Sequence, residues 1–181
     1  LKDSGAALIV TDSENFQLAL KLNGFVTSPI AILNLDDLDE YTLCVHGNRR
    51  IETDPNQIAY ILYTSGSTGK PKGVVQNQRN ILYYIRNWTR LFSITGTDRI
   101  AQFASFCHDG AIPDIYSALL NGATLYPFDI KRNPRSEEIA RWIIAEEITI
   151  WHSVPTWYRY FVNTINAAGE FRRLRFVVLG G

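Results

Sequence analysis

The chain alternates short apolar runs of strand length with stretches whose apolar residues recur every three or four positions. Residues 58–63, 99–103, 123–126, 148–151 and 175–179 are runs of the first kind. The first of them is continuously apolar, which is typical of a strand buried on both faces of a sheet. Between these runs lie stretches with a helical apolar period, so the sequence predicts an α/β fold with a largely parallel sheet flanked by helices.

Three helices are indicated by end signals as well as by period. Asn77 can cap the first, whose apolar stripe comprises Ile81, Tyr84, Ile85, Trp88, Leu91 and Phe92. Pro113 suits the first turn of the second helix and Gly122 its stop. Ser136 is expected to cap the third, which carries Glu137 and Glu138 in its first turn, where the helix dipole favours anions.

Composition and charge exclude several classes of function. Apolar residues make up 46% of the 181, too many for an intrinsically disordered chain. Eighteen Lys+Arg balance eighteen Asp+Glu, so nothing favours a nucleic-acid partner or an anionic membrane. No apolar run approaches the roughly 20 residues of a membrane span. Two cysteines are too few for a disulfide framework and fit the reducing cytoplasm, where we expect the protein to act.

The most informative segment for function is the glycine-rich stretch from Thr64 to Gly73, which reads TSGSTGKPKG. Its glycines allow backbone N–H groups to converge on one point, and such a concavity binds anions. Four hydroxyl side chains add neutral donors, and two lysines add positive charge, so the segment fits a polyphosphate. It is not a Walker P-loop, because only two residues separate Gly66 from Gly69 and Pro71 follows Lys70.

Residues 59–74 resemble the phosphate-binding signature of the adenylate-forming (AMP-binding) superfamily, and residues 1–12 and 109–125 are similar to other segments of its nonribosomal peptide synthetase branch. The resemblance implies activation of an amino acid with ATP, release of pyrophosphate and loading of a carrier-protein thiol. It assigns the ATP phosphates to Thr64, Ser65, Gly66, Ser67, Thr68, Gly69 and Lys72. Lys70 falls at a variable place in the motif and is left out.

The same resemblance places Asp109 where peptide synthetases hold the carboxylate that pairs with the substrate's α-ammonium. A carboxylate opposite an ammonium forms charge-assisted hydrogen bonds, which select amino acids over simple acids. The resemblance further implies a side-chain pocket lined by Gly110, Pro113, His152, Val178 and Gly180. His108 replaces the phenylalanine usual before the aspartate, and it could pair with Asp109 or be a neutral substitution.

The resemblance also implies what the chain lacks. Residues 1–181 are expected to be a partial adenylation domain, part of the large N-terminal subdomain, truncated at both ends and without the C-terminal lid. No complete catalytic set, and no Mg²⁺ ligand, is expected within it, so the chain alone should be inactive. The partners implied are an amino acid, ATP with Mg²⁺ and a carrier domain bearing phosphopantetheine. His46, His108 and His152 lack zinc-like spacing to either cysteine.

Two other functions stay open from the sequence. A fatty- or aryl-acid CoA ligase of the same superfamily would share the phosphate loop, but it would gain nothing from a carboxylate at Asp109. A degenerate, non-catalytic module kept as a scaffold between carrier domains is the third possibility, and the intact phosphate loop argues against it.

Overall fold

The computed structural model describes residues 1, 3–39, 51–66, 69–130, 132, 135–164 and 171–180, with residue 164 described by its backbone alone. It divides into two compact units, Leu1–Asp54 and Pro55–Gly181. The mixed α/β architecture with a parallel sheet confirms the expected fold class.

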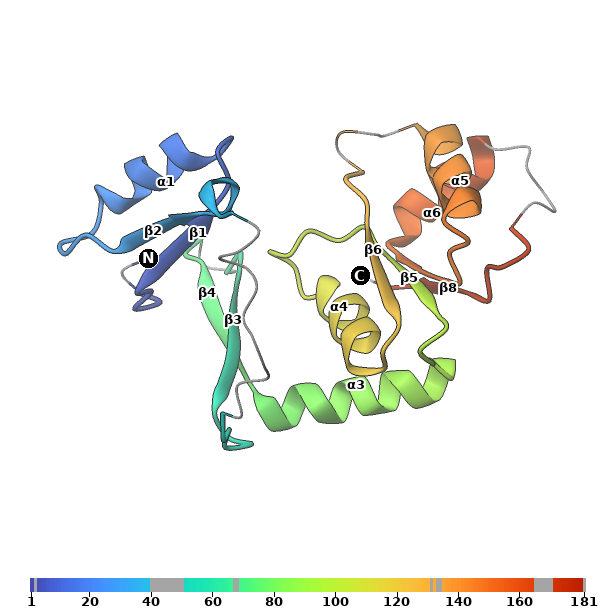
Figure 1. Ribbon diagram of the computed structural model, residues 1–181, viewed down its shortest axis with the longest axis horizontal. Coiled ribbons are helices and arrows are strands. Elements are labelled where there is room, and N and C mark those ends of the chain that lie inside the picture. Colours follow the sequence, from blue (N-terminus) through green and yellow to red (C-terminus); the bar gives the residue numbers. More distant parts are fainter. Residues whose placement is uncertain are drawn as a thin grey trace. The chain divides into compact units, whose positions relative to one another are not determined.

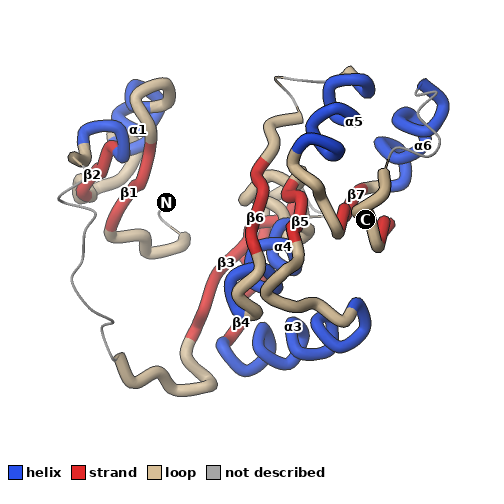
Figure 2. The backbone as a smooth tube through the Cα atoms, turned by 45° about the vertical axis from the view of Figure 1, so that its right-hand side comes forward, coloured by secondary structure: helices blue, strands red, loops and turns tan. Residues whose placement is uncertain are grey.

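The first unit is a strand–helix–strand element. Strand β1 (Leu8–Thr11) pairs in parallel with β2 (Ala31–Asn34), and helix α1 (Phe16–Asn23) connects them and lies beside both (Figure 2). A short 3₁₀ turn, η1 (Leu35–Asp37), follows β2.

The second unit begins with an antiparallel hairpin of β3 (Ile58–Thr64) and β4 (Lys72–Asn77). The prediction that residues 58–63 form a strand is confirmed, but the prediction that it is buried on both faces is wrong. Its residues are exposed or half-buried, because β3 pairs with β4 alone among the described strands and lies outside the parallel sheet. Strand β4 had no counterpart in the sequence prediction.

The core of the second unit is a four-stranded parallel sheet with the strand order β6-β5-β7-β8. Figure 1 labels β6, β5 and β8 of this sheet. The expected strands appear as β5 (Arg99–Gln102), β6 (Thr124–Pro127), β7 (Ile150–Ser153) and β8 (Phe176–Leu179). Their carboxyl ends all lie at one edge of the sheet, the edge at which open α/β sheets bind ligands.

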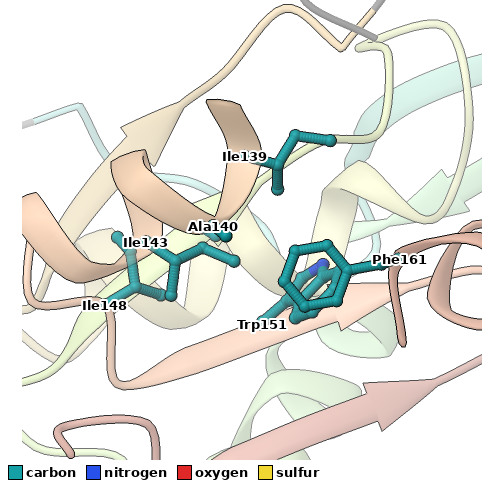
Figure 3. Packing of buried hydrophobic residues seen from close by; sticks show 7 residues of the cluster. Ile139, Ala140, Ile143, Ile148, Trp151 and Phe161 are labelled. Carbon is teal, nitrogen blue, oxygen red and sulfur yellow. The ribbon is translucent and has the colours of Figure 1, made fainter. Parts of the chain in front are cut away.

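Helices pack on both faces of this sheet. Helix α3 (Gln78–Phe92) and α4 (Ala111–Leu120) pack together on one face, where Ile94, Ile100, Ala118, Ala123 and Ile150 form a buried cluster. Helix α5 (Ser136–Ala145) and α6 (Pro155–Thr164) cover the other. There Ile139, Ala140 and Ile143 of α5 meet Trp151 of β7 and Phe161 of α6 (Figure 3). Alternate residues of β5 and β7 thus pack into the two hydrophobic clusters on opposite faces of the sheet.

The helix end signals are confirmed in part. Asn77 caps α3 by accepting a 2.8 Å hydrogen bond from the amide of Asn80, and Gly122 ends the α4 region with φ of +70°. The prediction that Ser136 caps α5 is wrong. Ser136 is the first helical residue, Arg135 holds the cap position without a side-chain bond, and the Ser136 hydroxyl is buried without a partner. Helix α6 was not predicted.

Candidate active site

The glycine-rich segment forms the turn of the β3–β4 hairpin. Thr64 ends β3 directly opposite Lys72, which begins β4. Between them, the amide of Gly69 donates a 2.9 Å hydrogen bond to the carbonyl of Gly66, and Gly69 adopts φ of +78°, which suits glycine. Ser67 and Thr68 lie outside the described residues. The turn therefore brings the Thr64 and Lys72 ends of the segment together, with both residues exposed.

A cavity of about 810 Å³ opens beside this turn, and we call it the hairpin cavity. It lies between the hairpin, α3 and the loop that precedes α4. Its lining comprises Tyr60, Leu62, Tyr63, Thr64, Ser65, Val74, Gln76, Asn80, Ile81, Tyr84, Cys107, His108, Asp109 and Ile112. Two expected phosphate-binding residues, Thr64 and Ser65, thus share a cavity with Asp109.

A second cavity of about 640 Å³ lies at the carboxyl edge of the parallel sheet, and we call it the aromatic cavity. All six residues that the resemblance assigned to the amino-acid substrate line it: Asp109, Gly110, Pro113, His152, Val178 and Gly180. The aromatic side chains of Tyr84, Trp88, Phe103 and Trp157 also line it, and the sequence did not identify them as site residues. The structure therefore brings together residues from α4, β7 and β8 that lie far apart in the sequence.

Asp109 belongs to the lining of both cavities, as do Tyr84 and His108. Its side chain is exposed in the described structure rather than enclosed, because it lies in the loop before α4. Its negative charge nevertheless reaches the tyrosines around it. Burial, and then the charge of Asp109, raise the pKa of Tyr60. The pKa of Tyr84 is raised by burial, then by the charge of Asp114 and then by that of Asp109. These hydroxyls therefore stay protonated beside the carboxylate.

His152 is paired with a carboxylate that sequence reasoning missed. Its Nδ1 lies 3.3 Å from Oδ1 of Asp114, a residue in the first turn of α4 whose side chain is only 2% exposed. Burial raises the pKa of Asp114 to about 6, although the hydrogen bond with His152 opposes the shift. The same hydrogen bond raises the pKa of His152, against the effect of burial. The sequence did show an aspartate four residues after Gly110. An acidic residue in the first turn of a helix is ordinarily explained by the helix dipole, so it did not indicate a partner for His152.

Metal and cysteine chemistry find little support in the described part of the chain. No group of three or more His, Cys, Asp or Glu side chains there converges as a metal site would require. Cys107 is a free, exposed thiol, while Cys44 and His46 lie outside the described residues. No described helix has the length and apolarity needed to cross a membrane.

The whole chain, residues 1–181, matches the family model of the AMP-binding enzymes. The chain belongs to this family. Members are adenylate-forming enzymes, and the likeness to nonribosomal peptide synthetases is confirmed by the relatives that follow.

Relatives at or above 30% identity include large synthetases. Bacitracin synthase 1 of Bacillus licheniformis is 34% identical over 182 residues, a match that covers 100% of this chain and 3% of that protein. Syringomycin synthase SyrB1 of Pseudomonas syringae pv. syringae is 30% identical over 184 residues, covering 100% of this chain and 28% of that protein. The chain thus spans a small part of the length of the curated relatives it matches.

Solved structures agree with the fold. The AMPPNP-bound nonribosomal peptide synthetase FmoA3 superposes with a TM-score of 0.79 at 25% identity, covering 100% of this chain and 18% of that one. The Vibrio cholerae adenylation domain AlmE, in complex with glycyl-adenosine-5'-phosphate, gives a TM-score of 0.74 at 26% identity, covering 88% of this chain and 33% of that one. The N-terminal domain of FACL13 from Mycobacterium tuberculosis shares the fold, with a TM-score of 0.81 at 21% identity and coverage of 99% and 46%.

Proposed function

We propose that the protein carrying this chain activates an α-amino acid with ATP and passes it to the thiol of a carrier domain in nonribosomal peptide synthesis. In the first step a carboxylate oxygen of the amino acid bonds to the α-phosphorus of ATP. The bond from that phosphorus to the bridging oxygen breaks, and pyrophosphate leaves with the electron pair. The thiol of a phosphopantetheine group then displaces AMP from the aminoacyl-adenylate.

The observation that carries the proposal is the position of Asp109 between the two cavities. The hairpin cavity joins Asp109 to Thr64 and Ser65 of the anion-binding turn. The aromatic cavity joins it to the apolar wall formed by Pro113 and Val178. Asp109 thus lies where three groups would come together: the ammonium of an amino acid, its side chain in the aromatic cavity and a phosphate at the turn.

The residues of the turn supply binding and charge stabilisation in this proposal. Hydroxyls of Thr64 and Ser65, with the Lys72 ammonium opposite, would hold the phosphates and stabilise the charge that develops on the leaving pyrophosphate. Mg²⁺ would neutralise further phosphate charge when bound. Asp109 would orient the substrate amine by a charge-assisted hydrogen bond.

Pyrophosphate exchange with paired substrates tests the proposal on the full-length protein. An amino acid is compared with the matching acid that lacks the amine, in the wild type and in Asp109→Ala. Once substrate fills the cavity, removal of the carboxylate leaves the ammonium desolvated and unpaired, which costs about 2–5 kcal/mol. Exchange with the amino acid should therefore fall roughly 30-fold to several thousandfold. Exchange with the des-amino acid should fall far less.

Glu137→Ala is the matched control, since it removes an exposed carboxylate from the first turn of α5, outside the lining of both cavities. It should leave both reactions unchanged. An equal loss on both substrates in Asp109→Ala would reject the role of Asp109. A wild type that prefers simple acids and transfers them to coenzyme A would be an acyl-CoA ligase, and one that supports no exchange with any acid would be a non-catalytic module.

A further inference from the structure

The pair of His152 and Asp114 lies beside the aromatic cavity, and neither phosphate binding nor amine recognition requires it. The imidazole is 13% exposed and the carboxylate 2% exposed, and the Nδ1–Oδ1 distance is 3.3 Å. The second carboxylate oxygen, Oδ2, is buried without a hydrogen-bond partner. Burial of a carboxyl group is costly unless it is compensated, so the pair calls for a specific explanation.

The geometry orients the imidazole with its other nitrogen toward the cavity. His152 lines the aromatic cavity and Asp114 does not, so the Nδ1 edge of the ring faces α4. The opposite edge lies against two glycines that also line the cavity. A Cβ on Gly180 would stand 3.3 Å from Nε2, and a Cβ on Gly110 would stand 3.9 Å from Cε1. Trp88 packs edge-on to the ring, with centroids 5.8 Å apart.

The protonation of the pair decides what Nε2 offers. An electrically neutral pair holds two protons, one shared between Nδ1 and Oδ1 and one on Nε2. Whichever partner holds the shared proton, Nε2–H remains a donor. Loss of one proton would leave a net negative charge in a buried position, which is unfavourable. The raised pKa values of both groups act in the same direction, because each holds its proton more tightly.

The hydroxyl of Ser153 also lines the cavity but donates to the backbone carbonyl of Val154. The Nε2–H of His152 is therefore the donor left for a substrate side chain. Pro113, Val178, Phe103 and Trp157 are apolar or aromatic. The other ionisable groups that line the cavity are Asp109, His108 and Tyr84, which lie where it meets the hairpin cavity. A pocket with mostly apolar walls and one placed polar group fixes both the orientation and the chemistry of its ligand.

We propose that Asp114 is a positioning residue that holds His152 as a hydrogen-bond donor, and that the amino acid activated carries an acceptor oxygen in its side chain. The substrate class is therefore a hydroxyl, carboxamide or carboxyl amino acid rather than an aliphatic or cationic one. This inference rests on the proposed function, and it adds a requirement that amino-acid activation alone does not make.

Pairs of amino acids with nearly equal shape test it in pyrophosphate exchange by the full-length protein. The pairs are threonine and valine, asparagine and leucine, and glutamine and homoleucine, with aspartate, glutamate and ornithine added. For the pair whose size fits, the member with the oxygen should have a kcat/KM at least tenfold higher, since a site built around a hydrogen bond strongly rejects the analogue that lacks it. His152→Leu should abolish this ratio, and His152→Gln, which retains an N–H donor, should restore part of it.

Asp114→Ala should reduce the same ratio severalfold, because exchange with the oxygen-bearing member should fall more than exchange with the apolar member. Ser117→Ala is its matched control, because Ser117 is also a buried polar residue of α4 but bonds the carbonyl of Pro113. It should not change the ratio. If Asp114→Ala lowered kcat/KM equally for both members of the pair, Asp114 would have only a structural role. Preference for the apolar member or for ornithine in the wild type would overturn the inference while leaving amino-acid activation intact.

Discussion

The carboxylate of Asp98 lies 2.6 Å from the guanidinium of Arg175, and this contact joins the amino ends of β5 and β8, 77 residues apart. The same oxygen accepts a 2.7 Å hydrogen bond from the hydroxyl of Thr149, which precedes β7. The other oxygen accepts a bond from the amide of Thr95. Three strands are thus held together at the edge opposite the aromatic cavity. Because rigid strands position the residues at their carboxyl ends, the network supports the site from a distance.

Arg175→Leu should destabilise the sheet. It leaves Asp98, which is 2% exposed, without its cationic partner. Because the Arg175 side chain is 39% exposed, we expect a loss of about 1–3 kcal/mol, less than the full cost of breaking a buried pair. Hydrogen exchange measured by mass spectrometry on the full-length protein should show faster exchange of amides in β5, β7 and β8. Arg173→Leu is the control, because Arg173 and Glu147 form an exposed pair at 3.5 Å, and its loss should cost under about 1 kcal/mol. Equal protection in the two variants would contradict the role given to Asp98.

The same pair predicts loss of stability in acid. Burial alone would raise the pKa of Asp98, but hydrogen bonds from Thr149, Thr95 and Arg175 outweigh it and lower the pKa below its usual range. A group with a lowered folded-state pKa stabilises fully above its unfolded pKa of about 3.9. That contribution is lost as the pH falls through the folded value. The difference in strand protection between wild type and Arg175→Leu should stay constant from pH 7 to 5 and shrink below about pH 4. A difference that grows on acidification would contradict the assignment.

Local signals were sufficient for the four strands of the parallel sheet and for helices α3, α4 and α5. In α3, the Asn77 cap and the buried Ile81 and Ile85 agree with the sequence pattern, although Leu91 of the expected stripe is 71% exposed. The failures came from tertiary context. Residues 58–63 look like an interior strand by composition, yet they pair in a hairpin, because composition does not specify the partner of a strand. Helix α6 was missed although Pro155 suits a first turn.

The candidate site likewise contains residues that the sequence indicated and residues that it did not. Its glycines, Asp109 and His152 are site residues only by resemblance to motifs in the sequence, and their roles stay predictions. Asp114 and the aromatic walls Trp88 and Trp157 could not be found that way, since they reach His152 or the cavity from three separate helices, α4, α3 and α6. Non-local pairs of this kind leave no periodic trace in one sequence.

Gly66→Ala should impair nucleotide binding more than folding. A Cβ at this position would overlap the backbone carbonyl oxygen of Lys70, so the turn between β3 and β4 has to shift. The hairpin ladder beyond Thr64 and Lys72 can persist, because its register does not involve Gly66. Titration with ATP should show at least tenfold weaker binding by the full-length protein, with protection of β3 and β4 amides retained. Loss of that protection would show that the glycine is needed for the hairpin itself.

Lys72→Ala in the full-length protein should slow adenylation about ten- to a thousandfold, equivalent to about 1.4–4 kcal/mol of barrier. Lys72 lies at the start of β4 opposite Thr64, where its ammonium can reach a phosphate bound at the turn. The charge matters most as negative charge builds on the leaving pyrophosphate, so kcat should fall more than the affinity for the amino acid. Lys70→Ala is the matched control, since Lys70 is an exposed cation in the same turn with no assigned role, and it should change kcat by under about threefold. Unchanged kcat with a large loss of amino-acid affinity in Lys72→Ala would show that this lysine acts at the amino-acid end of the site and not at the phosphate end. Equal effects of the two variants would show that only the total positive charge of the turn matters, not the position of Lys72.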